Sequence, residues 1–348
     1  MPEAWEVLTR IKKPEDEQRD VRVTIDRDLQ MFAAEQLKGR NGAVVVMNPQ
    51  TGDVLAMYSN PSFALSEVKN IDDVRRLERD RVNKPLLSRA TREFYLPGST
   101  FKTFTMLSAF QAGKDGLSFP DNPRPDCYTP FKGSKPICDF TGSGCEGIWC
   151  GQNIPLEPAF TLSSNQYFAQ LANALGRQQM AETARLVGMT PVETNKEALT
   201  QGFFPDIWHA SNKRIASALA PVRSTIVTGN KITLFEFGLE GMGQGALGIT
   251  PFQMALIASA AGNLEGNLMK PKIEADLPPQ VFSKILTPQQ ATEVRRIMAT
   301  VTPIAALTAL PIVVARGVVF DVTARAVPFI LGLVLLTGTL AHGFIVFA

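Results

Sequence analysis

The order of three short elements near the start of the chain constrains the fold most. Residues 21–25 (VRVTI) alternate apolar and polar side chains as a half-buried strand does, and Asp26 stands at the N-cap position of a helical pattern over residues 27–37. Residues 42–59 then place two apolar runs on either side of an Asn-Pro-Gln-Thr-Gly turn, which is typical of a hairpin. A helix beside an antiparallel hairpin predicts an α+β fold, with an antiparallel sheet flanked by helices.

Four later segments have helical patterns. The first has apolar side chains nearly all round its axis, which marks a helix buried in a core. The second and third are followed by glycines that can end a helix, and the fourth begins with Thr250 and Gln253 at capping-box spacing around a proline. In chain order the segments are residues 99–112, 164–175, 177–187 and 250–262.

The composition argues against several classes of function. Lys and Arg number 35 against 33 for Asp and Glu, so the net charge of +2 offers no basic surface for a nucleic-acid partner. Only two histidines are present, His209 and His342, which argues against a Ser/His/Asp triad and against a multi-histidine metal site. We therefore expect a catalytic base other than imidazole, no cofactor and no bound metal.

The segment LPGSTFK, residues 96–102, carries the clearest chemical signal. Its Pro-Gly pair predicts a turn, a helix is expected to begin near Ser99, and the i, i+3 spacing puts Lys102 on the same face one turn later, where amine and hydroxyl can touch. An amine in an apolar setting loses part of its preference for the charged form and can accept a serine proton near neutral pH. The helix N-terminus would add N–H groups where an oxyanion forms. Ser99 is therefore a candidate nucleophile, with Lys102 as its base.

Spacing alone leaves other interpretations of this segment open. Ser99 could be an ordinary helix N-cap, with Lys102 a snorkelling side chain that keeps its charge in water. A second Ser-x-x-Lys occurs at residues 66–69, within a charged stretch and without a preceding turn. We interpret that second copy as a surface feature.

A second hydroxyl and amide pair strengthens the chemical interpretation. Ser163, Ser164 and Asn165 fall at or just before the start of the helix predicted over residues 164–175. The group could be a simple N-cap. It could instead act in catalysis, with Ser163 passing a proton between Lys102 and a leaving group while Asn165 binds the amine and a substrate amide.

Ser-x-x-Lys followed by Ser-x-Asn is the pairing found in penicillin-binding proteins and class A β-lactamases. Over roughly residues 20–300 the chain resembles the transpeptidase domain of a class B penicillin-binding protein. The motifs that carry this resemblance are TIDRDLQ, GAVVVMNPQTGDVLAMYSNPSF, NKPLLSRATREFYLPGSTFKTFTMLSAF, SSNQYFAQLA, GMGQGALGITPFQMA and ATEVRRIMATVT. The resemblance implies the penicillin-binding/β-lactamase-like transpeptidase fold, with the active site between the sheet and a helical lobe.

The resemblance also implies a function. It implies an acyl-serine mechanism on the D-Ala-D-Ala end of peptidoglycan stem peptides, with Ser99 as nucleophile and Lys102 as its base. Ser163 and Asn165 would complete proton transfer and substrate contact, and β-lactam antibiotics would acylate Ser99. The implied location is the extracytoplasmic face of the bacterial cytoplasmic membrane, in the periplasm, and the implied partners are a glycosyltransferase and other cell-wall machinery. The alternatives are a catalytically silent scaffold or sensor, and a hydrolase of the β-lactamase or DD-carboxypeptidase type.

The sequence departs from this family pattern at two places. The family has a Lys-Thr-Gly or Lys-Ser-Gly motif on a core strand facing the serine, and a Gly-Gly-Thr segment soon after a stretch like residues 299–302 (ATVT); the sequence contains neither. The nearest candidate for the first is residues 336–339 (LTGT), where leucine replaces the lysine that would anchor the substrate carboxylate. Our hypothesis is a truncated or frame-disrupted copy of such an enzyme, which sequencing the locus for a restored Lys-Thr-Gly frame would test.

We expect three parts along the chain. Residues 1–20 are polar, with no apolar run suited to a signal peptide or membrane anchor, and are expected to be a linker remnant of a missing N-terminal pedestal. Residues 21–303 are the transpeptidase domain, with a Cys-rich insertion at 120–160. Residues 304–348 are a divergent hydrophobic tail. Its last 23 residues, 326–348, carry no charge and are long enough to span a bilayer, while buried strands or a change of reading frame would also explain them.

All four cysteines lie in the insertion, at Cys127, Cys138, Cys145 and Cys150. Their even number, the glycine-rich loop and the extracytoplasmic location implied by the resemblance favour two disulfides. A zinc cluster is the alternative, although neither Cys-x-x-Cys spacing nor histidine partners are present. Three connectivities are possible, and we favour the pairing of neighbours, Cys127 with Cys138 and Cys145 with Cys150.

Overall fold

The structure, a computed structural model, describes residues 21–198 and 200–315, with side chains as far as residue 301. The expectations for residues 1–20 and for the tail beyond residue 315, including its possible membrane span and its LTGT motif, lie outside this part of the chain. Within the described ranges, no helix combines the length and apolarity needed to cross a bilayer.

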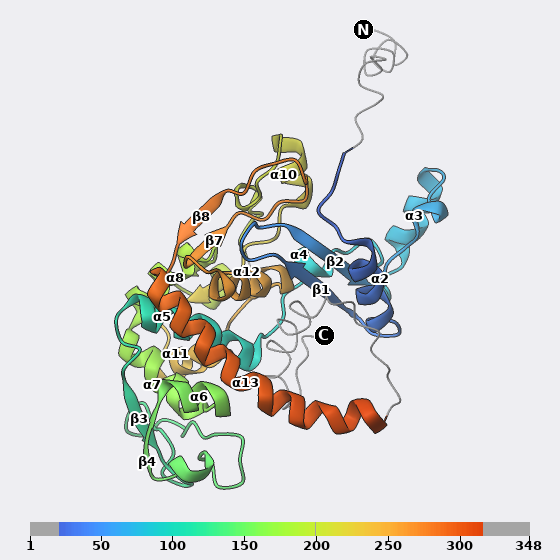
Figure 1. The fold of residues 1–348 in the computed structure, drawn as a ribbon. Helices are drawn as coiled ribbons and strands as arrows, with labels where there is room; N and C mark the ends of the chain where they lie inside the picture. The colour runs from blue at the N-terminus through green and yellow to red at the C-terminus, as the bar shows by residue number, and fades with distance from the viewer. Residues whose placement is uncertain (1–20, 199, 316–348) are drawn as a thin grey trace.

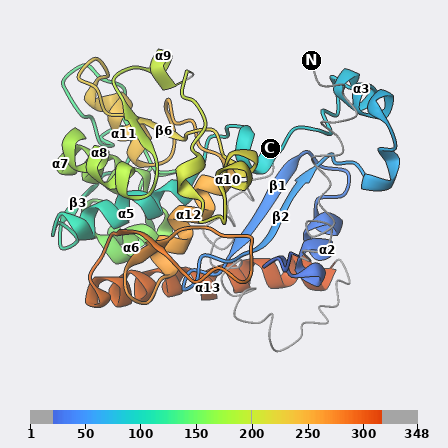
Figure 2. The same cartoon turned by 90° about the horizontal axis from the view of Figure 1, so that it is seen from above.

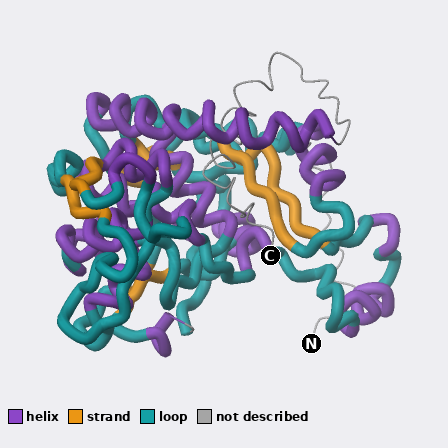
Figure 3. The backbone as a smooth tube through the Cα atoms, turned by 90° about the horizontal axis from the view of Figure 1, so that it is seen from below, coloured by secondary structure: helices purple, strands orange, loops and turns teal. Residues whose placement is uncertain are grey.

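Helices dominate, with short strands between them, as Figure 3 shows. The α-helices are α2 (Arg27–Gln36), α3 (Ile71–Arg79), α4 (Arg89–Arg92), α5 (Lys102–Gln111), α6 (Leu156–Leu162), α7 (Asn165–Leu175), α8 (Arg177–Leu186), α9 (Asn195–Ala198), α10 (Lys213–Leu219), α11 (Leu234–Gly241), α12 (Pro251–Gly262) and α13 (Pro288–Ala315). The 3₁₀ helices are η2 (Leu65–Glu67), η3 (Gly98–Phe101), η4 (Gly147–Trp149) and η5 (Pro205–Ile207). The strands are β1 (Gly42–Met47), β2 (Val54–Asn60), β3 (Ser118–Asp121), β4 (Gln152–Pro155), β5 (Thr190–Val192), β6 (Thr225–Val227), β7 (Asn267–Met269) and β8 (Val281–Lys284).

The described strands form two-stranded sheets, and the predicted hairpin is the β1–β2 pair. It is antiparallel, with Gly42 opposite Asn60, whereas β5 and β6 pair in parallel. Helix α2 packs beside the hairpin, and its Gln30 side chain both donates to and accepts from the backbone of Met57, at 3.0 and 2.9 Å. Asp26 caps this helix as predicted, since its carboxylate accepts from the N–H of Leu29. The α+β prediction is confirmed.

The hairpin lies on one side of the molecule and most of the helices gather on the other, while α13 runs along both (Figures 1 and 2). Helix α5 is at the centre of the helical part, and the prediction of a buried helix is confirmed. Its Phe104, Met106 and Leu107 side chains have no exposed surface. Because α5 contacts α7, α8 and α12, a polar group on it is enclosed by other helices.

The start of α12 differs in one respect from the sequence prediction. Thr250 is its N-cap, and the threonine hydroxyl accepts from the N–H of Gln253 at 3.1 Å, as capping requires. The reciprocal half of the predicted capping box is absent, because the Gln253 side chain donates to the carbonyl of Val187 at 2.7 Å. Gln253 is buried, and a buried amide takes the acceptor that packing brings closest.

Candidate active site

Lys102 is the first residue of α5, and its side chain is completely buried. Its Nζ donates to the carbonyl of Ser163 at 2.5 Å, to the hydroxyl of Ser163 at 3.0 Å and to Oδ1 of Asn165 at 2.9 Å. Burial lowers the pKa of Lys102 to about 7, and the charges of Asp139 and Glu146 partly oppose that shift. The structure thus joins the two predicted motifs and holds an amine that can be neutral near pH 7.

The connection between α6 and α7 explains how one Ser-Ser-Asn segment both caps a helix and reaches the lysine. Ser164 is the N-cap of α7, since its hydroxyl accepts from the N–H of Tyr167 at 3.1 Å. Ser163 ends α6 in the left-handed region, with φ 62° and ψ 40°, an uncommon conformation for a residue other than glycine. Capping therefore uses Ser164, which leaves Ser163 and Asn165 to bind Lys102.

Ser99 is half-buried and lies in η3, the tight turn just before α5. The sequence predicted contact between its hydroxyl and the amine of Lys102, but no hydrogen bond joins them in the described part of the chain. The reason is that three oxygen atoms of the 163–165 segment already take the three donors of the lysine ammonium. The other Ser-x-x-Lys copy is exposed at both Ser66 and Lys69, as expected of a surface feature.

A glycine segment braces the turn that carries Ser99. The N–H of Gly98 donates to the carbonyl of Gly243 at 2.9 Å, and the Thr105 hydroxyl donates to the carbonyl of Gly241 at 2.7 Å. Gly243 has φ +94°, and a Cβ added there would lie 1.7 Å from the carbonyl oxygen of Gly98. Sequence reasoning gave this residue no role, although the Gly-Met-Gly-Gln-Gly run was a visible signal for close backbone approach.

A buried carboxyl group, that of Glu240, connects the same glycine segment to a neighbouring strand. Glu240 is 1% exposed, and its carboxylate accepts from the N–H of Val227 at 2.9 Å. Burial raises the pKa of Glu240 to about 8, against the opposing effect of backbone N–H groups from Val227 and Ala246. The segment that supports Ser99 is thus tied to strand β6.

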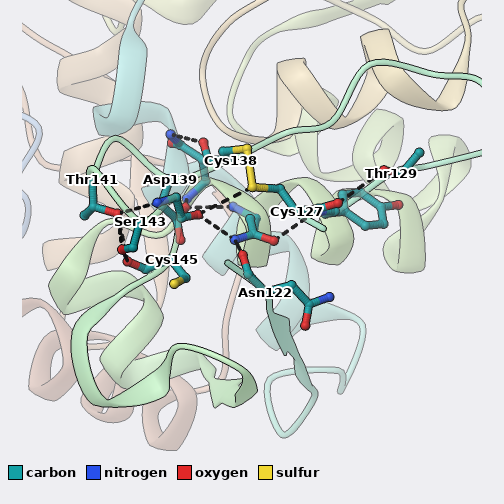
Figure 4. The surroundings of a disulfide bond; sticks show 12 residues. Asn122, Cys127, Thr129, Cys138, Asp139, Thr141, Ser143 and Cys145 are labelled. Carbon is teal, nitrogen blue, oxygen red and sulfur yellow. Dashed lines mark hydrogen bonds between the residues drawn. A yellow bond between two sulfur atoms is a disulfide. The ribbon is translucent and has the colours of Figure 1, made fainter. Parts of the chain in front are cut away.

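The Cys-rich insertion contains a disulfide between Cys127 and Cys138 (Figure 4) and a second one between Cys145 and Cys150. Each disulfide lies next to an acidic residue in the sequence, Asp139 after Cys138 and Glu146 after Cys145. Sequence reasoning did not single out either acid.

The charges of both acids act on Lys102, and the charge of Asp139 also acts on Glu146. Burial and the neighbouring Asp139 raise the pKa of Glu146 to about 7, while Lys102 opposes that shift. Burial also raises the pKa of Asp121, the third carboxyl group of this region. Among the residues that the structure describes, no group of His, Cys, Asp and Glu is arranged to hold a metal ion.

Comparison with known proteins places this chain in a family. Residues 42–306 match the family model for the penicillin binding protein transpeptidase domain. The chain is 30% identical to peptidoglycan D,D-transpeptidase MrdA of Acinetobacter baumannii, over 70% of the chain and 34% of that protein. It is also 30% identical to peptidoglycan D,D-transpeptidase PbpA of Mycolicibacterium smegmatis, over 72% of the chain and 46% of that protein.

A solved structure gives the same result. Penicillin-binding protein A of M. tuberculosis, in an imipenem acyl-enzyme complex, has a TM-score of 0.63 and 25% sequence identity, covering 80% of this chain and 62% of that one. The chain therefore spans less than half the length of these two curated relatives and somewhat under two thirds of the solved one. With the family model matching most of its residues, the chain belongs to the penicillin-binding protein transpeptidase domain family.

Proposed function

We propose that the chain is a serine-type D,D-transpeptidase that cross-links peptidoglycan stem peptides and is acylated by β-lactams. The observation that carries the proposal is the fully buried amine of Lys102, bound by Ser163 and Asn165 just after the turn that holds Ser99. The relatives named as peptidoglycan D,D-transpeptidases, and the acyl-enzyme complex of a structural neighbour, support it. The extracytoplasmic location and the glycosyltransferase and other cell-wall partners belong to the same proposal.

The roles of the four residues follow from their chemistry. The Ser99 hydroxyl attacks the carbonyl carbon of the penultimate D-Ala, and its proton passes to the neutral amine of Lys102. The proton then moves through the Ser163 hydroxyl to the nitrogen of the departing D-Ala, so that an acyl-serine ester remains. An amine of a second stem peptide attacks the ester and restores Ser99. Asn165 holds the amine of Lys102 and contacts the substrate amide.

Covalent labelling with a fluorescent penicillin tests this proposal directly. One label per chain, mapped by peptide mass spectrometry to Ser99 and blocked by unlabelled penicillin, is the expected result. Product analysis with a stem-peptide donor and an amine acceptor then separates transpeptidation from hydrolysis. A folded chain without any label would favour the silent scaffold, for which the absence of a Lys-Thr-Gly or Lys-Ser-Gly motif from the sequence is the specific observation.

The pH dependence of labelling provides a further prediction. Because burial lowers the pKa of Lys102 from its usual value to about 7, half of the amine is neutral at that pH. The acylation rate constant should therefore rise about tenfold per pH unit below pH 7 and level off above it. Stopped-flow labelling between pH 5 and 9, with circular dichroism as a control for folding, measures this. A rate constant that does not change over that range would contradict the role of Lys102 as the base.

A further inference from the structure

Asp139 lies in the Cys-rich insertion, directly after Cys138 and beside the disulfide that joins Cys138 to Cys127 (Figure 4). Its side chain is buried, at 1% exposed. The carboxylate accepts hydrogen bonds from the N–H of Asn165, from the N–H of Gln166 at 3.0 Å and from the hydroxyl of Ser164, at 3.1 Å to its nearer oxygen. All three donors belong to the start of α7, which carries the second predicted motif.

A carboxylate is well suited to this place. The first N–H groups of an α-helix have no partner within the helix, and the helix dipole adds positive charge there. The usual N-cap comes from a residue next to the helix, and Ser164 supplies it for the N–H of Tyr167. Asp139 satisfies two further N–H groups, one of them 26 residues away in sequence. The insertion therefore acts as a second cap on α7.

The insertion also sets the orientation of the Asn165 side chain. Its Nδ2 donates to the carbonyl of Cys138 at 3.3 Å, while its Oδ1 accepts from Lys102 at 2.9 Å. An amide held at its nitrogen by a carbonyl can present only its oxygen to the amine. Asp139 therefore holds the backbone of Asn165, and the carbonyl of Cys138 holds the side chain of Asn165.

We propose that Asp139 is a positioning residue, which holds Asn165 and the start of α7 in the arrangement that binds Lys102. Its effect on catalysis rests on the function proposed above, whereas its effect on α7 does not. Among the described residues, Asp139 makes no hydrogen bond to Lys102 or to Ser99, so it acts on the site through Asn165. The charge of Asp139 favours the protonated form of Lys102 and so opposes its use as a base, which means that a loss of rate on replacing Asp139 would come from positioning.

The test compares Asp139→Asn with Asp121→Asn. Asp121 is buried in the same region and accepts from the Gln166 side chain at 3.0 Å and from the N–H of Glu146 at 2.7 Å, but it makes no hydrogen bond to residues 163–165. Both substitutions replace one buried carboxyl group of the insertion with an amide of the same size. Only Asp139→Asn changes the group that accepts from the backbone N–H groups at the start of α7. An asparagine there can turn its NH₂ group, which only donates, toward those N–H groups.

Hydrogen exchange of peptides that cover residues 163–168 is the first measurement, and it requires no activity. We expect Asp139→Asn to speed exchange at the Asn165 and Gln166 amides by about tenfold or more, and Asp121→Asn to change it much less. Equal exchange in Asp139→Asn and the unaltered protein overturns the proposal, as does an equal increase in both variants. If Asp139→Asn does not fold, the Cys127→Ser/Cys138→Ser double variant keeps Asp139 but removes the disulfide that holds the preceding residue in place. Faster exchange at the same amides is then expected, and unchanged exchange overturns the proposal.

Penicillin acylation is the second measurement, resolved into the dissociation constant of the non-covalent complex and the first-order acylation rate constant. Positioning predicts that Asp139→Asn lowers the rate constant by about 10- to 100-fold with little change in the dissociation constant. Asp121→Asn should keep the rate constant within about threefold at a similar loss of Tm. Equal losses of rate in both variants would overturn the positioning role. If the unaltered chain is not labelled, the proposed function fails, and exchange alone decides whether Asp139 positions α7.

Discussion

Replacing Lys102 with methionine is expected to lower the acylation rate constant of Ser99 by about 10³-fold or more, while the chain stays folded. The substitution removes the only amine bound by Ser163 and Asn165 among the described residues and keeps a long side chain in the same space. Stability should remain within about 2 kcal/mol of the unaltered protein, because relief from burying an ammonium offsets the loss of its hydrogen bonds. Labelling kinetics and chemical denaturation measure the two quantities.

Stability as a function of pH gives a control for this variant. The pKa of Lys102 is lowered to about 7 in the folded chain, so between that value and its ordinary pKa the unfolded chain binds one more proton. The destabilising effect of burying the ammonium is complete below pH 7 and fades as the pH rises toward the ordinary lysine pKa. The free energy of unfolding should therefore rise by up to about 1.4 kcal/mol per pH unit between pH 7 and 9, relative to Lys102→Met. Identical pH dependences would show that Lys102 is not buried as an amine.

Replacing Gly243 with alanine is expected to destabilise the chain by about 2–5 kcal/mol and to lower the acylation rate by about 10²-fold. A Cβ there would lie 1.7 Å from the carbonyl oxygen of Gly98, whose own N–H donates to Gly243. Backbone atoms cannot rotate away as a flexible side chain can, so the turn before Ser99 must shift. The positive φ of Gly243 adds strain to any residue with a side chain.

Gly39→Ala is the matched control for that substitution. Gly39 also has positive φ, at +72°, but a Cβ added there meets no atom within 4 Å. Replacing Gly39 should lower the free energy of unfolding by about 1–2 kcal/mol, which is the strain of placing a residue with a Cβ at positive φ, and should leave the acylation rate unchanged. Denaturation curves and labelling rates measured on both variants separate strain from displacement of Ser99. Equal effects of the two substitutions on labelling would contradict the bracing role of Gly243.

The sequence was most informative where neighbouring residues decide the structure. The two apolar runs within residues 42–59 and the turn between them predicted the β1–β2 hairpin, and Asp26 and Thr250 were identified as helix caps. Helix α5 was predicted as buried from its apolar side chains alone, which made a lysine on it conspicuous. These features depend on residues a few positions apart, whose spacing is visible in the sequence.

Contacts between distant segments were only partly predictable from the sequence. The resemblance brought the two motifs together, but the distribution of tasks between Ser163 and Ser164 depends on the left-handed turn that ends α6. The expected hydrogen bond between Ser99 and Lys102 is absent because the 163–165 segment offers the amine three acceptors. Spacing along a helix tells which side chains share a face, but it does not tell which partner from another element lies closer.

By itself, the sequence determined the hairpin, the buried helix and its lysine, the helix caps and the residues that carry the two motifs. Only the tertiary structure decided that the amine binds residues 61 and 63 positions away, that Asp139 caps α7 from the insertion, and that Gly243 packs against the turn before Ser99. The physical reason is the separation along the chain of the residues that interact. Periodicity and capping arise from local geometry, whereas the burial of a charge and its choice of partners depend on how whole helices and loops pack together.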